Sequence, residues 1–533
     1  MLAGDIAGAE QVVLRHRYAL MNSERWHILE RWLRYFPDSA LDRSALLATT
    51  VTIVAQHGRN LQVLKPTLQK AEQLLADLTP NSATKDHLLG ELSVMKSILA
   101  VAAGNVEAAT TNARRGLQLL PAEALDLRAI AWGTLAASMQ MSGQSSTGYQ
   151  LLREKISEPE WGESIQAKLM SYLCMNCVLQ GDLTMALDWA GRVQNIGERL
   201  NLPESLCQAR YFMGVIHFLR GESDAAEPHL FALVENEVTS SPTFLVMGAM
   251  ALALIRHERG DERHADAILD RLTAYFREGG DSAALALLKA FRVELALRRG
   301  NLDAARRQQV GVEFEGRSPV WFFYYPQLTR VKLLLAEGTP EALAAAHATL
   351  DDFEQQMRLV NRNLARIEAL ALLALVCDAQ SDAARADASL TTALVLAKQA
   401  GIIRPFVDLG PPMASLLVRL QRQKRTSPAP DSSYVARILA AFPPPGTAGP
   451  RVVEPLPDAA KSVPVPQPML EPLTQRESQI LELLATELSP DEIGRRLYIS
   501  TSTVRTHSRN VYAKLDVHTR FEAVHRAREL GLR

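Results

Sequence analysis

Seven glycines recur along this 533-residue chain at nearly constant spacing. Successive members are 38 to 40 residues apart: Gly104, Gly143, Gly181, Gly221, Gly260, Gly300 and Gly338. Gly58 precedes them by 46 residues. Short polar residues that can cap a helix follow several of the glycines: Asn105, Asp182, Asp261 and Asn301. Five residues after the glycine, a small residue that lets helices approach closely recurs: Ala109, Ala186, Ala226, Ala265 and Ala305.

One glycine turn between helices is common, but even spacing over six intervals is typical of stacked helix–turn–helix units. The sequence therefore predicts an all-α fold that begins with an α-solenoid. Because its period is longer than the ~34 residues of the standard tetratricopeptide repeat (TPR), we describe the solenoid as TPR-like.

Three segments divide the chain. Residues 1–420 are expected to form the helical-repeat domain. Residues 421–472 are expected to be a linker with one short helix near 434–442, because ten of the thirty residues from Pro443 to Pro472 are proline. Residues 473–533 are expected to form a separate C-terminal domain.

An aromatic run inside the repeats could have either of two roles. It consists of Trp321, Phe322, Phe323, Tyr324 and Tyr325 and lies between two prolines. Tryptophan and tyrosine combine stacking area with a polar group, so Trp321, Phe322, Tyr324 and Tyr325 are candidates for an effector pocket. The alternative is that these rings fill a gap between repeats, and we favour that alternative.

Composition and termini limit the remaining function classes. The cysteines Cys174, Cys177, Cys207 and Cys377 include one CxxC pair without a second pair at zinc-site spacing, so we expect reduced thiols and no metal. The first residues do not have the pattern of a signal peptide, and no apolar run reaches membrane-spanning length. We expect a cytoplasmic protein without membrane contact, catalytic residues or cofactor.

The last sixty residues read as four short helices, three of which begin with a hydroxyl residue followed by Glu three positions later. These pairs are Thr474/Glu477, Ser489/Glu492 and Thr519/Glu522. The second helix, 490–497, ends in Arg495 and Arg496, and a short turn leads into the third helix. Two short helices, a tight turn and a basic second helix describe a helix-turn-helix.

The third helix carries two distinct faces. An apolar stripe is expected to face the core: Val504, His507, Val511 and Leu515. Another face presents hydroxyls and guanidiniums suited to guanine edges and phosphates: Ser502, Arg505, Thr506 and Arg509. Residues 495–520 hold six basic residues against one acidic residue, which favours this interpretation over an ordinary solvated helix.

The stretches LTQRE, LSPDEIGRRLYIS, STVRTHSRNVYAKL and ARELGL resemble the LuxR-type DNA-binding domain. The resemblance implies that Arg505, Thr506 and Arg509 face base edges of double-stranded DNA, with Thr503 and Lys514 near the backbone. His507 matches the family's histidine and is expected to be a packed, hydrogen-bonded core residue.

Three positions depart from the family pattern, and none lies on the proposed reading face. Glu487 stands where the first helix usually ends in glycine. Gly494 replaces an alanine within the second helix, and Asp516 replaces a glycine after the third.

The solenoid is similar to the sensor domain of the large ATP-dependent LuxR-type activators, the maltose-regulon-activator family, with residues 401–417 as its closing element. Those activators carry a nucleotide-binding domain before the solenoid. This sequence has no GxxxxGK[ST] phosphate loop and no Gly-Lys dipeptide. We therefore expect no ATP binding, in a chain that lost the domain, never had it, or is a fragment or split reading frame.

The leading interpretation is a transcription regulator whose solenoid senses a protein partner or a small effector. RNA polymerase or another protein is an expected partner, and a weak dimer on paired half-sites is expected on DNA. The alternatives are an interaction scaffold, or a regulator fragment, with weak DNA binding.

Overall fold

The computed structural model describes residues 5–57, 61–76, 83–235, 242–279, 281–314, 323–423, 432–442, 473–484, 488, 490–497, 499–515, 517 and 520–529. Within these ranges every regular element is a helix and no strand is present. The predicted all-α class is confirmed.

The helices fall into three groups along the chain. The first group is α1 (Ile6–Asn22), α2 (Trp26–Leu33), α3 (Asp38–Leu41), α4 (Ala45–His57) and α5 (Leu61–Ala76). The central repeats are α6 (Ala83–Ala102), α7 (Val106–Leu119), α8 (Leu125–Met141), α9 (Ser145–Ile156), α10 (Glu163–Gln180), α11 (Leu183–Leu200), α12 (Pro203–Leu219), α13 (Ser223–Glu235), α14 (Pro242–Glu258), α15 (Glu262–Gly279), α16 (Ser282–Arg298), α17 (Leu302–Gln308), α18 (Pro326–Glu337), α19 (Pro340–Leu359), α20 (Asn363–Ala379) and α21 (Ala383–Ala400). The chain then forms α22 (Arg404–Val407), α23 (Gly410–Gln423), α24 (Ser432–Ala440), α25 (Gln475–Leu484), α26 (Pro490–Leu497), α27 (Thr501–Leu515) and α28 (Arg520–Glu529).

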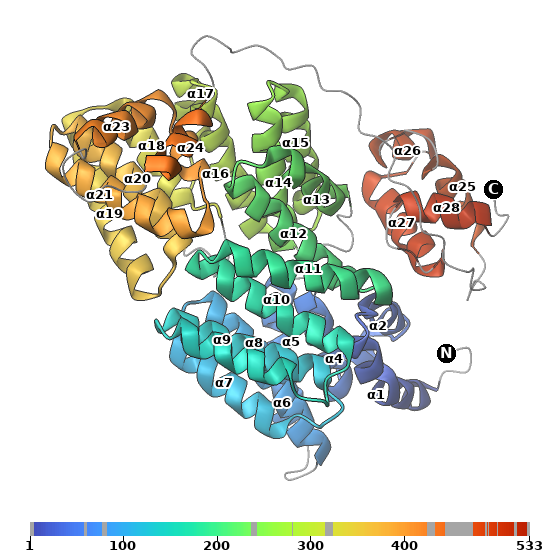
Figure 1. Ribbon diagram of the computed structural model, residues 1–533. Coiled ribbons are helices and arrows are strands. Elements are labelled where there is room, and N and C mark those ends of the chain that lie inside the picture. The colour runs from blue at the N-terminus through green and yellow to red at the C-terminus, as the bar shows by residue number, and fades with distance from the viewer. Residues whose placement is uncertain are drawn as a thin grey trace.

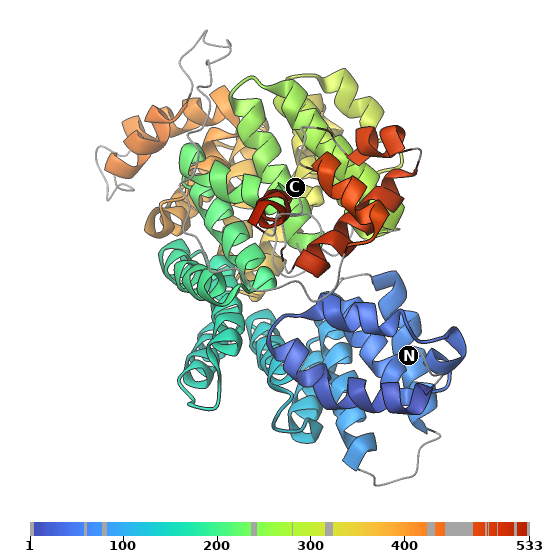
Figure 2. The same ribbon diagram turned by 90° about the vertical axis from the view of Figure 1, so that its right-hand side faces the viewer.

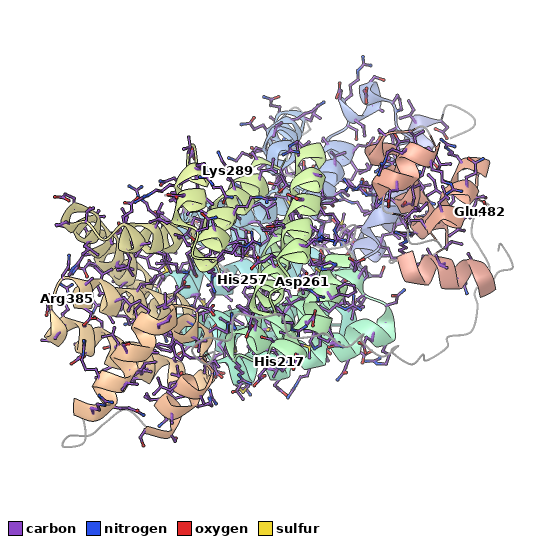
Figure 3. The ribbon with its side chains drawn as sticks, turned by 90° about the horizontal axis from the view of Figure 1, so that it is seen from above. His217, His257, Asp261, Lys289, Arg385 and Glu482 are labelled. Atoms are coloured by element: carbon purple, nitrogen blue, oxygen red, sulfur yellow. The ribbon has the colours of Figure 1, made fainter. Side chains whose placement is uncertain are left out.

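The seven periodic glycines each end a repeat's first helix in the left-handed region, with φ between +67° and +83°. An L side chain is strained there, so glycine suits this position. The expected caps also form, since Asn105, Asp182, Asp261 and Asn301 accept hydrogen bonds from backbone N–H groups three residues ahead. Figure 3 shows His257 and Asp261 close together at one such turn. The five recurring alanines are fully buried.

The predicted TPR-like solenoid is thus confirmed, and Figure 1 shows its helices stacked as antiparallel pairs. Gly58 lies outside the described residues. The short helix expected near 434–442 is α24, and it packs on the solenoid: Tyr434 and Ile438 are buried in the same core as the repeats. Residues 443–472, the proline-rich part of the expected linker, lie outside the described residues.

The solenoid also contacts itself between repeats that are far apart in sequence. The Gln140 side chain at the end of α8 donates hydrogen bonds to the carbonyls of Val360 and Asn361, at 3.1 and 3.3 Å. Asn361 in turn donates to the Ser145 hydroxyl at 2.6 Å. Figure 2 shows the blue and cyan first repeats below the green, yellow and orange later ones. The superhelix therefore turns far enough to place its later repeats against its earlier ones.

A second contact between distant repeats joins the end of α12 to the chain after α21. The Ile403 amide donates to the Leu219 carbonyl at 2.9 Å, and Arg220 Nε donates to the Ala400 carbonyl at 3.1 Å. Together with the Gln140 contact, these bonds fix how the successive turns of the superhelix are stacked.

Helix α20 explains why these contacts form. Nearly all residues from Leu364 to Cys377 are buried, so the helix has no polar face to turn toward solvent. A helix that is apolar all round must be covered all round. Helix α20 accordingly packs against its sequence neighbours and also against α10, α22 and α23.

One set of charged groups inside the solenoid is centred on Glu294. Glu294 on α16 accepts from Lys332 Nζ at 2.7 Å and from Arg298 Nε at 2.8 Å, and Arg298 also pairs with Asp408 at 2.8 Å. Burial by itself would raise the pKa of Glu294, but Lys332 and Arg298 outweigh it and lower the pKa to about 2. Through Asp408, this ionised network attaches the closing element, residues 401–417, to α16.

The packing between turns of the superhelix can be tested with Gly143→Ala. A Cβ at Gly143 would lie 2.9 Å from the Leu359 backbone oxygen, in addition to the strain of φ +75°. Gly300→Ala is the matched control, because φ is +69° there and nothing lies within 4 Å of the added Cβ. We expect the control to lose about 1–2 kcal/mol of unfolding free energy. Gly143→Ala should lose about 1–3 kcal/mol more in denaturant titrations. Equal losses would contradict the contact.

Candidate nucleic-acid interface

Helices α25 to α28 form a small bundle, shown beside the solenoid in Figure 1, with two apolar clusters of its own. One contains Leu481, Val511 and Leu515, and the other contains Ile480, Ile493 and Val504. The apolar stripe predicted on the third helix is therefore in the core at Val504, Val511 and Leu515. Because that stripe is buried, the orientation of α27 about its own axis is fixed.

The first helix begins with the predicted reciprocal cap. The Glu477 amide donates to Thr474 Oγ1 at 3.3 Å, and the Thr474 amide donates to Glu477 Oε2 at 2.8 Å. Ser489 and Thr519, the caps of the other two predicted boxes, lie outside the described residues. The start of α27 has a cap that the sequence reasoning missed: Ser500 Oγ accepts from the Thr503 amide at 3.1 Å. The signal was present, since serine immediately before a helix is a favoured cap.

Lys514 forms an ion pair inside the bundle. Its Nζ lies 2.6 Å from Glu477 Oε2, and the two side chains are only 13 % and 5 % exposed. Burial acts to raise the pKa of Glu477, but hydrogen bonds from Lys514 and Thr474 outweigh it and hold the pKa below its usual range. The pair connects the end of α27 to the start of α25.

Two arginines hold the C-terminal ends of helices. Arg476 donates to the Leu497 carbonyl at 2.6 Å, and Arg520 Nε donates to the Leu484 carbonyl at 2.7 Å. Such bonds satisfy carbonyls that have no partner within their own helix. Arg476, Arg520 and Lys514 therefore stabilise the bundle. Fewer basic side chains then remain as candidates for binding an external ligand.

The remaining candidates lie at the surface to different degrees. Arg495, Arg496 and Thr506 are exposed, whereas Thr503, Arg505 and Arg509 are half-buried. The Thr503 hydroxyl is 2.7 Å from Ser500 Oγ. Ser502 belongs to α27, but its side chain is not among those that the structure describes. The structure thus places Arg505, Thr506 and Arg509 on one helix, with Arg495 and Arg496 at the end of the helix before it.

Arg505 contacts the solenoid. Its Cζ lies 5.5 Å from the ring centroid of Tyr275 on α15, a cation–π distance. No sequence pattern indicates this contact, because the two residues are 230 positions apart.

His507 is half-buried on α27. Within the part of the chain that the structure describes, its buried Nδ1 has no hydrogen-bond partner, so the bond expected for this residue is not found at that atom. Of the three departures from the family pattern, Gly494 is buried in α26, whereas Glu487 and Asp516 lie outside the described residues.

The aromatic run is only partly described, since Trp321 and Phe322 fall outside the described residues. Tyr324 is buried against Phe291, and its hydroxyl lies 3.0 Å from Thr329 Oγ1. Tyr325 is buried against Phe353. Both rings therefore fill the core between repeats.

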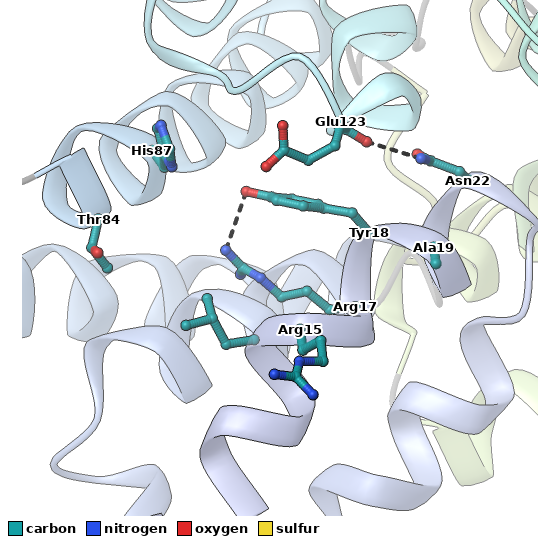
Figure 4. A pocket seen from close by; sticks show the side chains of 9 residues that line it. Arg15, Arg17, Tyr18, Ala19, Asn22, Thr84, His87 and Glu123 are labelled. Carbon is teal, nitrogen blue, oxygen red and sulfur yellow. Dashed lines mark hydrogen bonds between the residues drawn. The ribbon is translucent and has the colours of Figure 1, made fainter.

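A cavity of about 420 Å³ lies elsewhere, between α1, α6 and the turn before α8 (Figure 4). Figure 4 shows the Tyr18 ring crossing it, with His87 and Thr84 on one side and Glu123 above. Arg17 Nη2 donates to the Tyr18 hydroxyl at 3.2 Å, and Asn22 donates to the Glu123 carbonyl at 2.9 Å. This cavity could not be predicted from sequence patterns, because its lining comes from three separate segments.

The described residues also bear on whether the chain has a metal site, a disulfide or a membrane-spanning helix. Among those residues no group of three or more histidine, cysteine or acidic side chains could hold a metal ion. The four cysteines are buried and form no disulfide with one another, and burial raises the pKa of the Cys174 and Cys177 thiols. No described helix is long and apolar enough to cross a membrane.

The Lys514 pair can be tested by Lys514→Met, which leaves the Glu477 carboxylate buried without its partner. We expect a loss of about 1–3 kcal/mol, measured by hydrogen exchange of α25 and α27 in the whole chain. Because the folded pKa of Glu477 is lowered, its stabilisation should be complete above pH 4.5 and be lost as the pH falls further. Lys514→Met should flatten that acid dependence.

The control is Lys70→Met, which breaks the exposed Lys70–Asp42 pair and should change local stability by less than about 0.5 kcal/mol. An equally small effect at Lys514 would mean that the ion pair contributes little to the bundle.

Two family models match this chain. The MalT-like TPR region matches residues 90–423, and the bacterial regulatory proteins of the luxR family match residues 471–527.

Two individual proteins are also similar. The HTH-type transcriptional regulator MalT of Serratia proteamaculans (strain 568) is 26 % identical over 99 % of this chain and 59 % of its own length. The chain thus spans about three fifths of the length of that curated relative. A crystal structure of a Rap protein complexed with Competence and Sporulation Factor aligns at a TM-score of 0.45 and 12 % identity, covering 67 % of this chain and 98 % of that one.

The first family model covers well over half of the sequence, and the second extends from before α25 into α28. The chain therefore belongs to the family of the MalT-like TPR region and ends in a domain of the luxR family of bacterial regulatory proteins.

Proposed function

We propose that this chain is a DNA-binding transcriptional regulator whose helix α27 enters the major groove. The observation that carries the proposal is the division of α27 into a buried apolar stripe and a face bearing Arg505, Thr506 and Arg509. Arg505 and Arg509 are one helical turn apart and therefore share that face. Arginine can bind guanine O6 and N7 through two hydrogen bonds, which makes these residues the proposed source of base preference.

Backbone contacts are assigned to other side chains. Arg495 and Arg496 are exposed at the end of α26 and can neutralise phosphates without reading sequence. Ser502 and Thr503 lie in the first turn of α27, whose N-terminal end favours a phosphate. Lys514 is already paired with Glu477, so we assign it to the bundle's stability ahead of any backbone contact.

The solenoid is proposed to receive the regulatory signal from a protein partner, such as RNA polymerase, or from a small effector. The contacts between distant repeats support this role. A ligand that changes the packing between turns of the superhelix would change the conformation of the whole domain. One recognition helix covers few base pairs, so two chains on neighbouring half-sites would give useful specificity. The second candidate function is an interaction scaffold with weak DNA binding.

Substitution of the two arginines tests the base-reading role. DNA sites would first be selected from a random pool with the whole chain. Arg505→Ala and Arg509→Ala should each weaken binding to a selected site by about 1–3 kcal/mol and broaden the base preference. Arg306→Ala, which removes an exposed arginine from the solenoid, is the control and should leave binding unchanged. If the selection yields no preferred site, the scaffold function is favoured.

The contact between Arg505 and Tyr275 gives a separate prediction. DNA and Tyr275 compete for the same guanidinium, so Tyr275→Ala should raise apparent DNA affinity. A cation–π contact of about 0.5–1 kcal/mol corresponds to an increase of about two- to fivefold in titrations. Tyr149→Ala removes a similar contact with Arg153 inside the solenoid and serves as the control. Unchanged DNA affinity in Tyr275→Ala would show that this contact does not restrain the bundle of α25 to α28.

A further inference from the structure

The segment Asn22–Trp26, here called the latch, connects α1 to α2 and crosses the N-terminal ends of three helices much later in the chain. Asn22 Oδ1 accepts from the Asp126 amide on α8 at 2.9 Å, and the Asn22 carbonyl accepts from the Ser164 hydroxyl on α10 at 2.9 Å. Glu24 Oε2 accepts from the Glu204 and Ser205 amides on α12, at 2.8 and 3.1 Å. The Ser205 hydroxyl donates to Glu24 Oε1 at 2.5 Å.

These three helices lack a cap of their own. The residues before α8, α10 and α12 are Ala124, Gly162 and Leu202, and none makes a side-chain cap. Helices α7, α11 and α17, by contrast, are capped by the residue directly before them. The latch therefore supplies from more than 100 residues away what α8 and α12 lack locally.

Glu24 is held in a costly conformation. Its φ is +56°, in the left-handed region, which costs a non-glycine residue about 1–2 kcal/mol. Its side chain is almost fully buried. The hydrogen bonds to α12 must offset both costs for the latch to stay in place.

The latch docks onto a buried set of charges in which carboxylates outnumber ammonium groups. Glu24, Asp126 and Glu204 surround a single lysine, Lys168, which contacts Asp126 and lies 3.4 Å from Glu204. His57 completes the set, with Nδ1 3.3 Å from Glu204 and Nε2 3.8 Å from Asp126. If His57 is neutral and every carboxyl group is ionised, the cluster carries two excess negative charges.

Asp126 Oδ2 is buried and has no hydrogen bond within the described residues, so the negative charge of this cluster is incompletely compensated. A proton on Glu24 would remove its repulsion with Glu204, and the Glu24 carboxyl could still accept from the two amides. This protonation reduces the excess charge and favours the docked latch.

We propose that Asn22–Trp26 is a pH-sensitive latch that closes on α8, α10 and α12 when the cluster takes up protons and loosens as the pH rises. Opening it would free the end of α1 and the start of α2. The rest of α1 would stay attached through Arg17, whose Nη1 and Nη2 lie 2.9 and 2.6 Å from the Glu91 carboxylate. The latch therefore offers the regulator a conformational response that does not depend on the DNA-binding role.

The pH range over which the latch loosens is set by the Glu24 carboxyl group. Burial, and then repulsion from Glu204, raise the pKa of Glu24 from 4.5 to about 7 even though Lys168 and Ser205 oppose the rise. A carboxyl group with a raised folded pKa stabilises the closed state most below its unfolded pKa. That stabilisation is lost as the pH rises toward the folded value. Glu24 alone should thus loosen the latch about tenfold between pH 6 and pH 8.

Hydrogen exchange of the whole chain at pH 6 and pH 8, corrected for intrinsic rates, tests the proposal. Protection should fall about tenfold at pH 8 in three separate segments, residues 20–30, 125–128 and 203–207. The amide of Ala304 is an internal reference, because the neutral Asn301 caps it locally and its protection should stay constant. Equal protection at both pH values in the three segments would overturn the proposal.

Three substitutions assign the effect to its residues. Glu24→Gln should remove most of the pH dependence. Glu204→Gln should lower the midpoint and keep the latch closed at pH 8, so it tests the proposal even if Glu24→Gln does not fold. Glu123→Gln is the control, because its side chain is exposed and only its carbonyl contacts Asn22. A full wild-type response in Glu24→Gln, or an unshifted midpoint in Glu204→Gln, would contradict the latch.

Discussion

The fold depends on a backbone position that only glycine occupies easily. At the end of each repeat's first helix the chain must turn back within about two residues, and a left-handed residue achieves this while satisfying the last carbonyls. The next residue then caps the following helix, as Asn105 and Asn301 do. With the turn fixed, a buried alanine five residues later lets the two helices pack closely in five of these repeats. The glycine turn itself occurs seven times, and its repetition generates the superhelix.

The superhelix in turn determines which helices can be apolar. Because later repeats lie against earlier ones, the first helix of each pair is covered by its neighbours and, in the case of α20, by α10 as well. Within that interior the carboxylate of Glu294 is balanced by Lys332 and Arg298. The small bundle follows the same rule, since its buried carboxylate Glu477 is paired with Lys514.

Local patterns predicted the parts of the fold that depend on local chemistry. The glycines, their polar caps and the stripe of Val504, Val511 and Leu515 are all readable from spacing, because each reflects one turn or one helix. Contacts between distant segments were not predictable in this way. Asn22 and Glu24 cap helices 104 and 180 residues away, and Arg505 meets Tyr275 on another domain. The resemblance implies that Lys514 lies near the DNA backbone, and nothing nearby in sequence shows that it also pairs with Glu477.

The bonds from Gln140 to Val360 and Asn361 have a consequence for modularity. A helical-repeat array in which each unit touches only the next can gain or lose a unit with little effect elsewhere, since its stability is a sum over neighbours. Here residue 140 is bonded to partners 220 positions away, so the number of repeats between them sets which residues meet. Inserting or deleting one unit would move every such pair out of register. The length of this array is thus a constrained property, and its evolution must proceed mainly by substitution within repeats of fixed number.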